Sequence, residues 1–222
     1  MKLVYLTHHP IDIKDGQITV VATTSFAAYT DFVQGFQGKD TLIKFNTDDY
    51  DVLPTAKAID WIGDPLLSKD ICKQYLTDAL SLVFSDLTDS SRMAIQRGWN
   101  QVLADLEKAI FMEDLPLAVS TDLDFKKLLK FSNLHFNDDI ASSPYGIIET
   151  VVKIHQACGL KSTIMLSNLS HYLDQSHFNE LNKLIKETNL SLILLEFDSD
   201  KHQSFYKEAS FNYIDADLVD WY

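Results

Sequence analysis

The hydrophobic periodicity of this chain changes between its ends and its middle, and this change limits its possible folds. Toward both ends, short apolar runs alternate with turn residues or helical stretches. From Ser68 to about Ser132, apolar residues recur at the spacing of one helix face. The simplest assembly is an α/β head domain, residues 1–62 and 140–222, with an all-α leg domain, residues 63–139, inserted into it.

The N-terminal part of the head is predicted to hold short strands and one helix. The helix has an apolar face from Ala28 to Phe36, and a threonine at position 23 or 24 is placed to cap it. The turn signal Asp15-Gly16 separates the first two strands. The β-prone runs are Lys2–Leu6, Gln17–Ala22, Thr41–Phe45 and Ala58–Ile62.

The leg is predicted to consist of three helices. Their apolar stripes cover Ile71–Val83, Met93–Ile110 and a shorter stretch after Asp122. Asp114-Leu115-Pro116 ends the second helix, because proline cannot continue it. We expect the first two helices to pack antiparallel after a short return, as a protruding hairpin.

The C-terminal part of the head alternates helix and strand. A helix around Ile147–Ile154 ends at Cys158-Gly159, and a second helix is predicted over Asp174–Glu187. The strands Thr163–Leu166 and Leu190–Leu195 are almost continuously apolar. Such strands, alternating with helices, predict a parallel sheet that is covered on both faces.

Composition restricts the class of protein. The longest apolar run is strand-sized, well short of the roughly 20 residues of a membrane helix. Cys72 and Cys158 are far apart and outside any CxxC pair, so we expect a cytoplasmic chain without a disulfide or zinc framework. The formal net charge of −13 opposes binding to nucleic acid at long range. DNA binding therefore requires either that the few cations gather on one surface with the acids elsewhere, or that metal ions offset the acids.

No segment matches a working phosphate loop. The first strand-to-helix turn, Val21–Phe26, lacks the glycine and lysine of GxxxxGK[ST], and its Thr24 and Ser25 are assigned to helix capping. Gly35–Asp40 echoes the motif but follows a helix, so we interpret it as a helix C-cap and turn. Leu194–Asp198 resembles a magnesium-binding strand end. Without a phosphate loop we interpret it as a buried strand that enters a polar loop.

The rare cations are the candidate DNA contacts, although a solvated face explains such clusters equally well. Three lie on the third leg helix and two on the second: Lys126, Lys127, Lys130, Arg92 and Arg97. Oligomerisation would have to concentrate them around a common axis.

Two clusters of acidic residues, the second with histidines, are candidate metal sites. Hard oxygen ligands suit calcium at the first, and a histidine and a glutamate that share one helix face could hold a metal at the second. Capping and solvation account for both clusters as well. The first flanks the loop before the third leg helix and contains Glu113, Asp114, Asp122 and Asp124. The second surrounds the start of a head helix and contains His171, Asp174, His177 and Glu180.

Taken in order, several segments resemble the short form of the CRISPR-associated Csn-two family, the accessory adaptation protein of type II-A systems. The likeness covers nearly the whole length, with similar spacing. The segments are Pro10-Ile11, Gly16–Val20, Phe32-Val33-Gln34, Asp60–Gly63, Leu128-Leu129-Lys130, Lys161–Asn168 and Thr188–Glu196.

This resemblance implies a head similar to P-loop kinases, with a degenerate phosphate loop and no nucleotide. It implies homotetrameric rings whose positive lumen encircles double-stranded DNA and slides from free ends. It also implies calcium ions, for which only Asp122 and Asp124 remain as candidate ligands, since Lys126 and Lys127 stand where more acids are expected. The implied partners are the CRISPR integrase proteins and the RNA-guided effector nuclease. No binding to a membrane is expected.

The favoured hypothesis is therefore a non-catalytic, sequence-independent binder of DNA ends that supports spacer acquisition in antiviral defence. The five cations named above are its expected phosphate contacts. Two alternatives stay open. One is a nucleotide-dependent kinase or hydrolase of P-loop ancestry, and the other is an acidic protein–protein adaptor.

Overall fold

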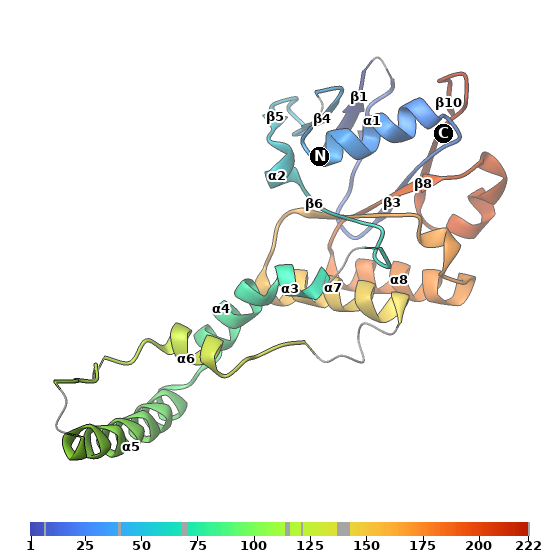
Figure 1. Ribbon diagram of the computed structural model, residues 1–222. Coiled ribbons are helices and arrows are strands. Elements are labelled where there is room, and N and C mark those ends of the chain that lie inside the picture. Colours follow the sequence, from blue (N-terminus) through green and yellow to red (C-terminus); the bar gives the residue numbers. More distant parts are fainter. Residues whose placement is uncertain are drawn as a thin grey trace. The chain divides into compact units, whose positions relative to one another are not determined.

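The computed structural model describes residues 1–6, 8–39, 41–67, 71–113, 116–120, 122–136 and 143–221. The chain forms two compact units (Figure 1). We call Met1–Cys72 with Asn137–Tyr222 the head unit, and Lys73–Phe136 the leg unit. The sequence placed these boundaries after residue 62 and before residue 140. None of the described helices has the length and apolar content that crossing a bilayer requires.

A six-stranded sheet forms the centre of the head unit. Its strand order is β10-β9-β3-β8-β7-β6, and all neighbours are parallel except β10, which is antiparallel to β9. Helix α1 lies on one face of this sheet, and α7 and α8 lie side by side on the other (Figure 1). The strands are β3 (Ile18–Thr23), β6 (Ile59–Gly63), β7 (Thr163–Ser167), β8 (Leu192–Phe197), β9 (Ser210–Ile214) and β10 (Asp220–Trp221).

Burial explains why β3 and β8 lie at the middle of this sheet. All six residues of β3 are buried, as are the first five of β8. Strands that are apolar on both faces need cover from both sides, which crossover helices supply. The predicted mixed α/β head with a parallel sheet is thus confirmed.

A second, four-stranded antiparallel sheet was not expected. It has the order β2-β1-β4-β5. The sequence placed the first two strands on either side of the Asp15-Gly16 turn, but the structure places them in different sheets. β1 alternates half-buried and buried residues, so it suits a sheet with one covered face, unlike β3. The strands are β1 (Lys2–Tyr5), β2 (Ile11–Asp12), β4 (Ile43–Asn46) and β5 (Val52–Leu53).

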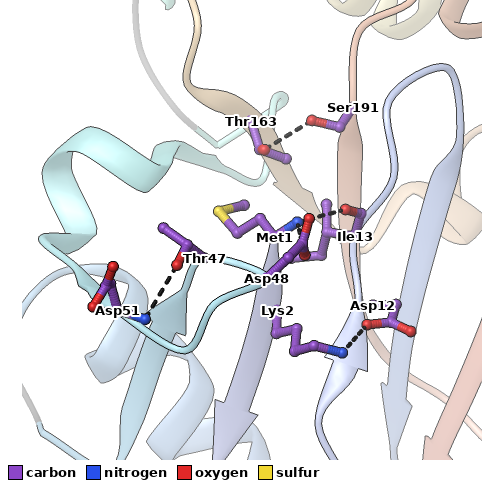
Figure 2. A network of polar contacts seen from close by, with 9 residues as sticks. All are labelled: Met1, Lys2, Asp12, Ile13, Thr47, Asp48, Asp51, Thr163 and Ser191. Carbon is purple, nitrogen blue, oxygen red and sulfur yellow. Dashed lines mark hydrogen bonds and ion pairs between the residues drawn. The ribbon is translucent and has the colours of Figure 1, made fainter.

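Polar contacts fix the start of the chain to this second sheet, as Figure 2 shows. The N-terminal ammonium of Met1 donates to the Ile13 carbonyl at 3.3 Å and to Asp48 Oδ1 at 3.1 Å. The ammonium of Lys2 reaches Asp12 Oδ1 at 2.6 Å and so joins β1 to β2. These contacts hold β1 between its two partner strands.

The head helices begin and end at capping residues. Ser25 caps α1 by accepting from the Ala28 backbone N–H, in place of the threonines proposed first. Gly159 ends α7 with φ 65°, and Asp174 caps α8. Gly35–Asp40, the segment that resembles a phosphate loop, was predicted to be a helix C-cap and turn. The structure confirms this for residues 35–39, and Asp40 lies outside the described residues. The helices are α1 (Phe26–Phe36), α2 (Thr55–Ala58), α7 (Pro144–Cys158) and α8 (Gln175–Thr188), with 3₁₀ turns η2 (Leu169–His171) and η3 (Asp200–Tyr206).

The described part of the leg differs from the expected hairpin. The helix that packs against α4 is α6, through the rings of Phe84 and Phe125. The connection between α4 and α5 is Leu87 and Thr88, both extended, and Thr88 caps α5 at once. Figure 1 shows α5 continuing away from the end of α4, so α5 does not fold back along α4. The leg helices are α4 (Leu76–Asp86), α5 (Asp89–Met112) and α6 (Phe125–Phe131), and the short α3 (Ile71–Gln74) contains the boundary between the two units.

Two glycines allow a test of this packing. Gly35 lies in α1, where an added Cβ would come within 2.5 Å of Ile43 Cβ on β4. We expect Gly35→Ala to lower the free energy of unfolding by about 2 kcal/mol, because overpacking outweighs the better helix propensity of alanine. Gly98 of α5 has no heavy atom within 4 Å of the same position, so Gly98→Ala should not destabilise the protein. Urea denaturation of both variants checks the prediction, and equal effects would contradict it.

Candidate functional site

The carboxyl edge of the parallel sheet is where open α/β folds place ligands, so the first strand-to-helix turn is the first candidate. Here the Ser25 N–H donates to Thr23 Oγ1 at 3.0 Å, and Thr24 Oγ1 contacts the Tyr213 hydroxyl at 2.8 Å. The ring of Phe26, the first residue of α1, packs 5.0 Å from that of Phe197 at the end of β8. The turn therefore presents hydroxyl groups that are already hydrogen-bonded and an aromatic pair.

A fully buried carboxyl group lies at the same edge. Glu196, near the end of β8, has no exposed surface. Its Oε1 accepts from the Leu169 N–H at 2.9 Å and from the Ser170 N–H at 3.4 Å. Its Oε2 accepts from the Ser170 hydroxyl at 2.9 Å. Glu196 thus occupies backbone N–H groups at the start of η2, which could otherwise receive an anion.

Burial changes the acidity of this group. Desolvation raises the pKa of Glu196 to about 7, although the hydrogen bonds from Ser170 and Leu169 lower it. Its carboxyl is therefore divided between protonated and ionised forms near neutral pH. Because Glu196 has no exposed surface, a change in its protonation acts on its internal partners Leu169 and Ser170.

Tyrosine hydroxyls surround the same edge. Tyr172 donates to Asp64 Oδ1 at 3.2 Å, and Tyr29 donates to Asn168 Oδ1 at 3.2 Å. Burial is the main cause that raises the pKa of Tyr172, and the negative charge of Asp64 adds to it. These hydroxyls therefore stay protonated and act as hydrogen-bond donors to the loops after β6 and β7.

The expected DNA contacts lie on α5 and α6, in the leg unit. Lys127 is exposed, and its ammonium is 3.8 Å from Asp124 Oδ2. Arg97 is also exposed, with one long contact of 3.4 Å to the Met93 carbonyl. The side chains of Lys126 and Lys130 lie outside what the structure describes.

Arg92 has a structural role that the sequence did not indicate. Its guanidinium donates to the Phe84 carbonyl at 2.8 Å and to the Leu87 carbonyl at 3.0 Å. It also lies 4.6 Å from the centre of the Phe84 ring. Arg92 therefore satisfies carbonyl groups at the end of α4 and joins α4 to α5. A phosphate contact would have to use its remaining N–H groups.

One of the two acids proposed for calcium uses its carboxylate as a helix cap. Asp124 Oδ1 accepts from the Lys127 N–H at 3.1 Å, so it caps α6. At Asp122 it is the backbone N–H that donates to Ser120 Oγ, at 3.4 Å. Two carboxylates supply at most four of the roughly six to eight oxygens that calcium takes. No group of three or more His, Cys, Asp or Glu suited to a metal occurs among the described residues, which exclude Asp114. Calcium binding by Asp122 and Asp124 stays a prediction.

The four residues of the second acidic cluster lie on two different elements, η2 and the start of α8. Asp174 accepts from the His177 N–H at 2.9 Å, which confirms it as the cap of α8 and lowers its pKa. Glu180 is exposed on the same helix. His171 belongs instead to η2, beside Ser170.

Comparisons with known proteins show the fold. No family model and no curated protein matches the sequence. Among solved structures, the chain is similar to Stu0660 of Streptococcus thermophilus, with 13% sequence identity and a TM-score of 0.59. The match covers 100% of this chain and 76% of Stu0660. At this identity the likeness concerns the fold alone.

The raised pKa of Glu196 predicts that stability falls as pH rises. Below pH about 4.5 both the folded and the unfolded chain hold the proton. Between about 4.5 and 7 only the folded chain holds it. The free energy of unfolding should therefore decrease by about 3 kcal/mol across this window. Glu196→Gln, which keeps an acceptor for both N–H groups, should remove that contribution, as urea denaturation at several pH values would show.

The exposed Glu180 provides the matched control for this experiment. Glu180→Gln should keep the pH dependence of the parent. If Glu196→Gln and Glu180→Gln had identical pH profiles, the assignment of this dependence to Glu196 would be wrong.

Proposed function

We propose that this chain is a short-form member of the Csn-two family and binds double-stranded DNA ends as a homotetrameric ring. The observation that carries the proposal is the ordered series of segments that resemble the family along nearly the whole chain. The fold likeness to Stu0660 of Streptococcus thermophilus, which covers the whole chain, is a separate finding about the fold. The proposed role is in spacer acquisition in the cytoplasm, with the integrase proteins and the RNA-guided effector nuclease.

The charge distribution supports the leg as the DNA-facing unit. Residues 73–136 contain seven lysines and arginines against nine acids, so they contribute only −2 of the total charge of −13. The head unit carries the remaining −11. Because DNA repels an acidic surface, the nearly neutral leg with its basic α6 is the better partner for phosphates.

The surface of α5 supports self-association. Leu103 is its only buried residue, and the structure describes all 24 of its residues. Several large apolar side chains of this helix are exposed, namely Met93, Val102, Leu106, Phe111 and Met112. Such a surface is unfavourable in water unless another surface covers it. A second copy of the chain is the partner that the ring requires.

We propose that the protein is non-catalytic. The residues at the carboxyl edge of the parallel sheet favour this proposal over a P-loop kinase or hydrolase. The first turn offers no glycine for close backbone approach to a phosphate and no lysine for its charge. At the neighbouring turn, Glu196 already accepts from two backbone N–H groups. An anion at that turn would have to displace an internal carboxyl group.

Replacing the three lysines of α6 tests the DNA interface. We expect Lys126→Ala, Lys127→Ala and Lys130→Ala together to weaken binding to linear duplexes of every sequence alike. The negative slope of log affinity against log salt should become shallower by about three units, since each phosphate contact contributes about one unit to it. Fluorescence anisotropy at several salt concentrations measures both quantities, with closed circular duplex as competitor.

A charge-matched control is available in the head unit. Lys44, Lys57 and Lys207 are exposed, and their triple alanine variant changes the net charge equally. That variant should bind like the parent. Equal losses in both variants would mean that only net charge matters, and no loss in the α6 variant would refute this site.

A charge among the exposed apolar side chains of α5 tests the ring. Leu106 is 46% exposed, so Leu106→Glu should leave the folded monomer intact while placing a carboxylate in the proposed contact. We expect light scattering to show a tetramer for the parent and a smaller species for the variant. Asp105→Glu, which keeps the charge at the neighbouring exposed position, serves as the control. A monomeric parent would refute the ring.

A further inference from the structure

The basic helix α6 of the leg unit also presents a large aromatic side chain to solvent. Phe131 is the last residue of α6 and is 86% exposed. A single exposed apolar residue is common on protein surfaces and by itself indicates nothing. Phe131, however, lies in a segment with three lysines and no acid, residues 125–136, within a chain of net charge −13. Its surroundings therefore favour an anionic partner.

The packing of α6 inside the leg unit leaves Phe131 and Lys127 on one side of the helix. Phe125 packs on an aromatic ring of α4 at 6.2 Å, and Leu128 and Leu129 are half-buried. Lys127 and Phe131 are both exposed and four residues apart, which is the spacing of neighbours on one helix face. A cation and an aromatic ring thus lie next to each other, on the side of α6 opposite to Phe125.

Hydrogen bonds hold the last turn of α6 in place around Phe131. The Ser132 N–H donates to the Leu128 carbonyl at 2.9 Å, and the Ser132 hydroxyl donates to the Leu129 carbonyl at 2.6 Å. Asn133 then ends the helix with a φ of 53°, in the left-handed region. Because the backbone at Phe131 is fixed before a partner arrives, a contact with its ring costs little ordering of the chain.

Nucleic acid offers both surfaces that this side of α6 would contact. Its phosphates attract a lysine ammonium, and its flat bases stack on aromatic side chains. Inside a duplex, every base pair is covered on both faces by its neighbours, so a ring can stack there only by forcing two pairs apart. The last base pair leaves one face uncovered. A lysine can therefore contact phosphates along the whole duplex, whereas a neighbouring aromatic ring stacks readily only at an end.

From this arrangement we propose that Phe131 stacks on the uncovered face of the last base pair of a duplex, while Lys127 contacts a phosphate beside it. The inference rests on the proposed function, because it requires that the leg unit binds DNA. It adds a residue that distinguishes an open end from the interior of the duplex. Threading of a ring over an end does not need such a residue, so the two causes of end preference can be separated.

Duplexes that carry the fluorescent base 2-aminopurine test the stacking directly. The parent protein should quench 2-aminopurine at a blunt end and leave an interior 2-aminopurine unchanged. Phe131→Leu keeps an apolar side chain but removes the flat ring. We expect this variant to lose the quenching at the end and to bind blunt duplexes about ten-fold more weakly. Phe131→Trp keeps a flat ring and should retain both properties.

Phe26→Leu is the matched control variant. Phe26 is 80% exposed and belongs to the head unit, so its variant should bind and quench like the parent. A second comparison separates stacking from threading. Duplexes whose last base pairs are covered by a covalently attached planar cap still allow a ring to thread. The parent should bind them about ten-fold more weakly than blunt duplexes, and Phe131→Leu should bind both alike.

The outcomes distinguish this inference from the proposed function. Quenching at the end that persists in Phe131→Leu, or that is lost equally in Phe26→Leu, would overturn the stacking while DNA binding itself stands. A smaller mass of Phe131→Leu than of the parent in light scattering would assign Phe131 to a contact between copies, which also overturns the stacking. Failure of the folded parent to bind any linear duplex would overturn both proposals.

Discussion

Burial of the central strands on both faces is the constraint on which the rest of the head depends. β3 and β8 are neighbours and have almost no exposed surface, so helices must cover the sheet on both sides. The covering helices require crossovers, and crossovers place every strand-to-helix turn at one edge. Glu196 is buried at that edge because the strand carrying it is buried. The acidity of Glu196 is therefore a consequence of the sheet.

The sequence predicted the elements whose periodicity is strong and long. The parallel strands and α8 were found because unbroken apolar runs alternate with a capped amphipathic helix. β9 and β10 were missed because Ser210–Ile214 is only partly buried and Asp220–Trp221 is a two-residue pairing. The pairing of β1 was also missed, since its partners are set by tertiary contacts and not by the nearest turn. Local patterns carry no information about such partners.

The candidate site was less predictable than the fold, for an electrostatic reason. The Leu194–Asp198 segment was correctly interpreted as a buried strand entering a loop. That interpretation did not include the effect of burial on Glu196, which is a raised pKa. The available signal was an acid inside an otherwise apolar strand. Its partners, the N–H groups of Leu169 and Ser170, lie about 26 residues earlier and become visible only in three dimensions. Arg92 is the converse case, a cation whose sequence neighbours gave no sign that it closes a helix end.

Ser170 connects the acidity of Glu196 with a hollow of about 280 Å³ at the sheet edge, which Ser170, His171, Phe197, Asp198 and Phe205 line. Its hydroxyl can face the hollow as an acceptor only while it donates to Glu196 Oε2, which requires that oxygen to be unprotonated. If the carboxyl takes up a proton on Oε2, it can donate to Ser170 instead, and the serine hydroxyl is then free to point its own proton into the hollow. With a pKa of about 7, both states are populated near neutral pH. The hydrogen-bond preference of the hollow is thus linked to a proton equilibrium inside the sheet, even though Glu196 itself does not line the hollow.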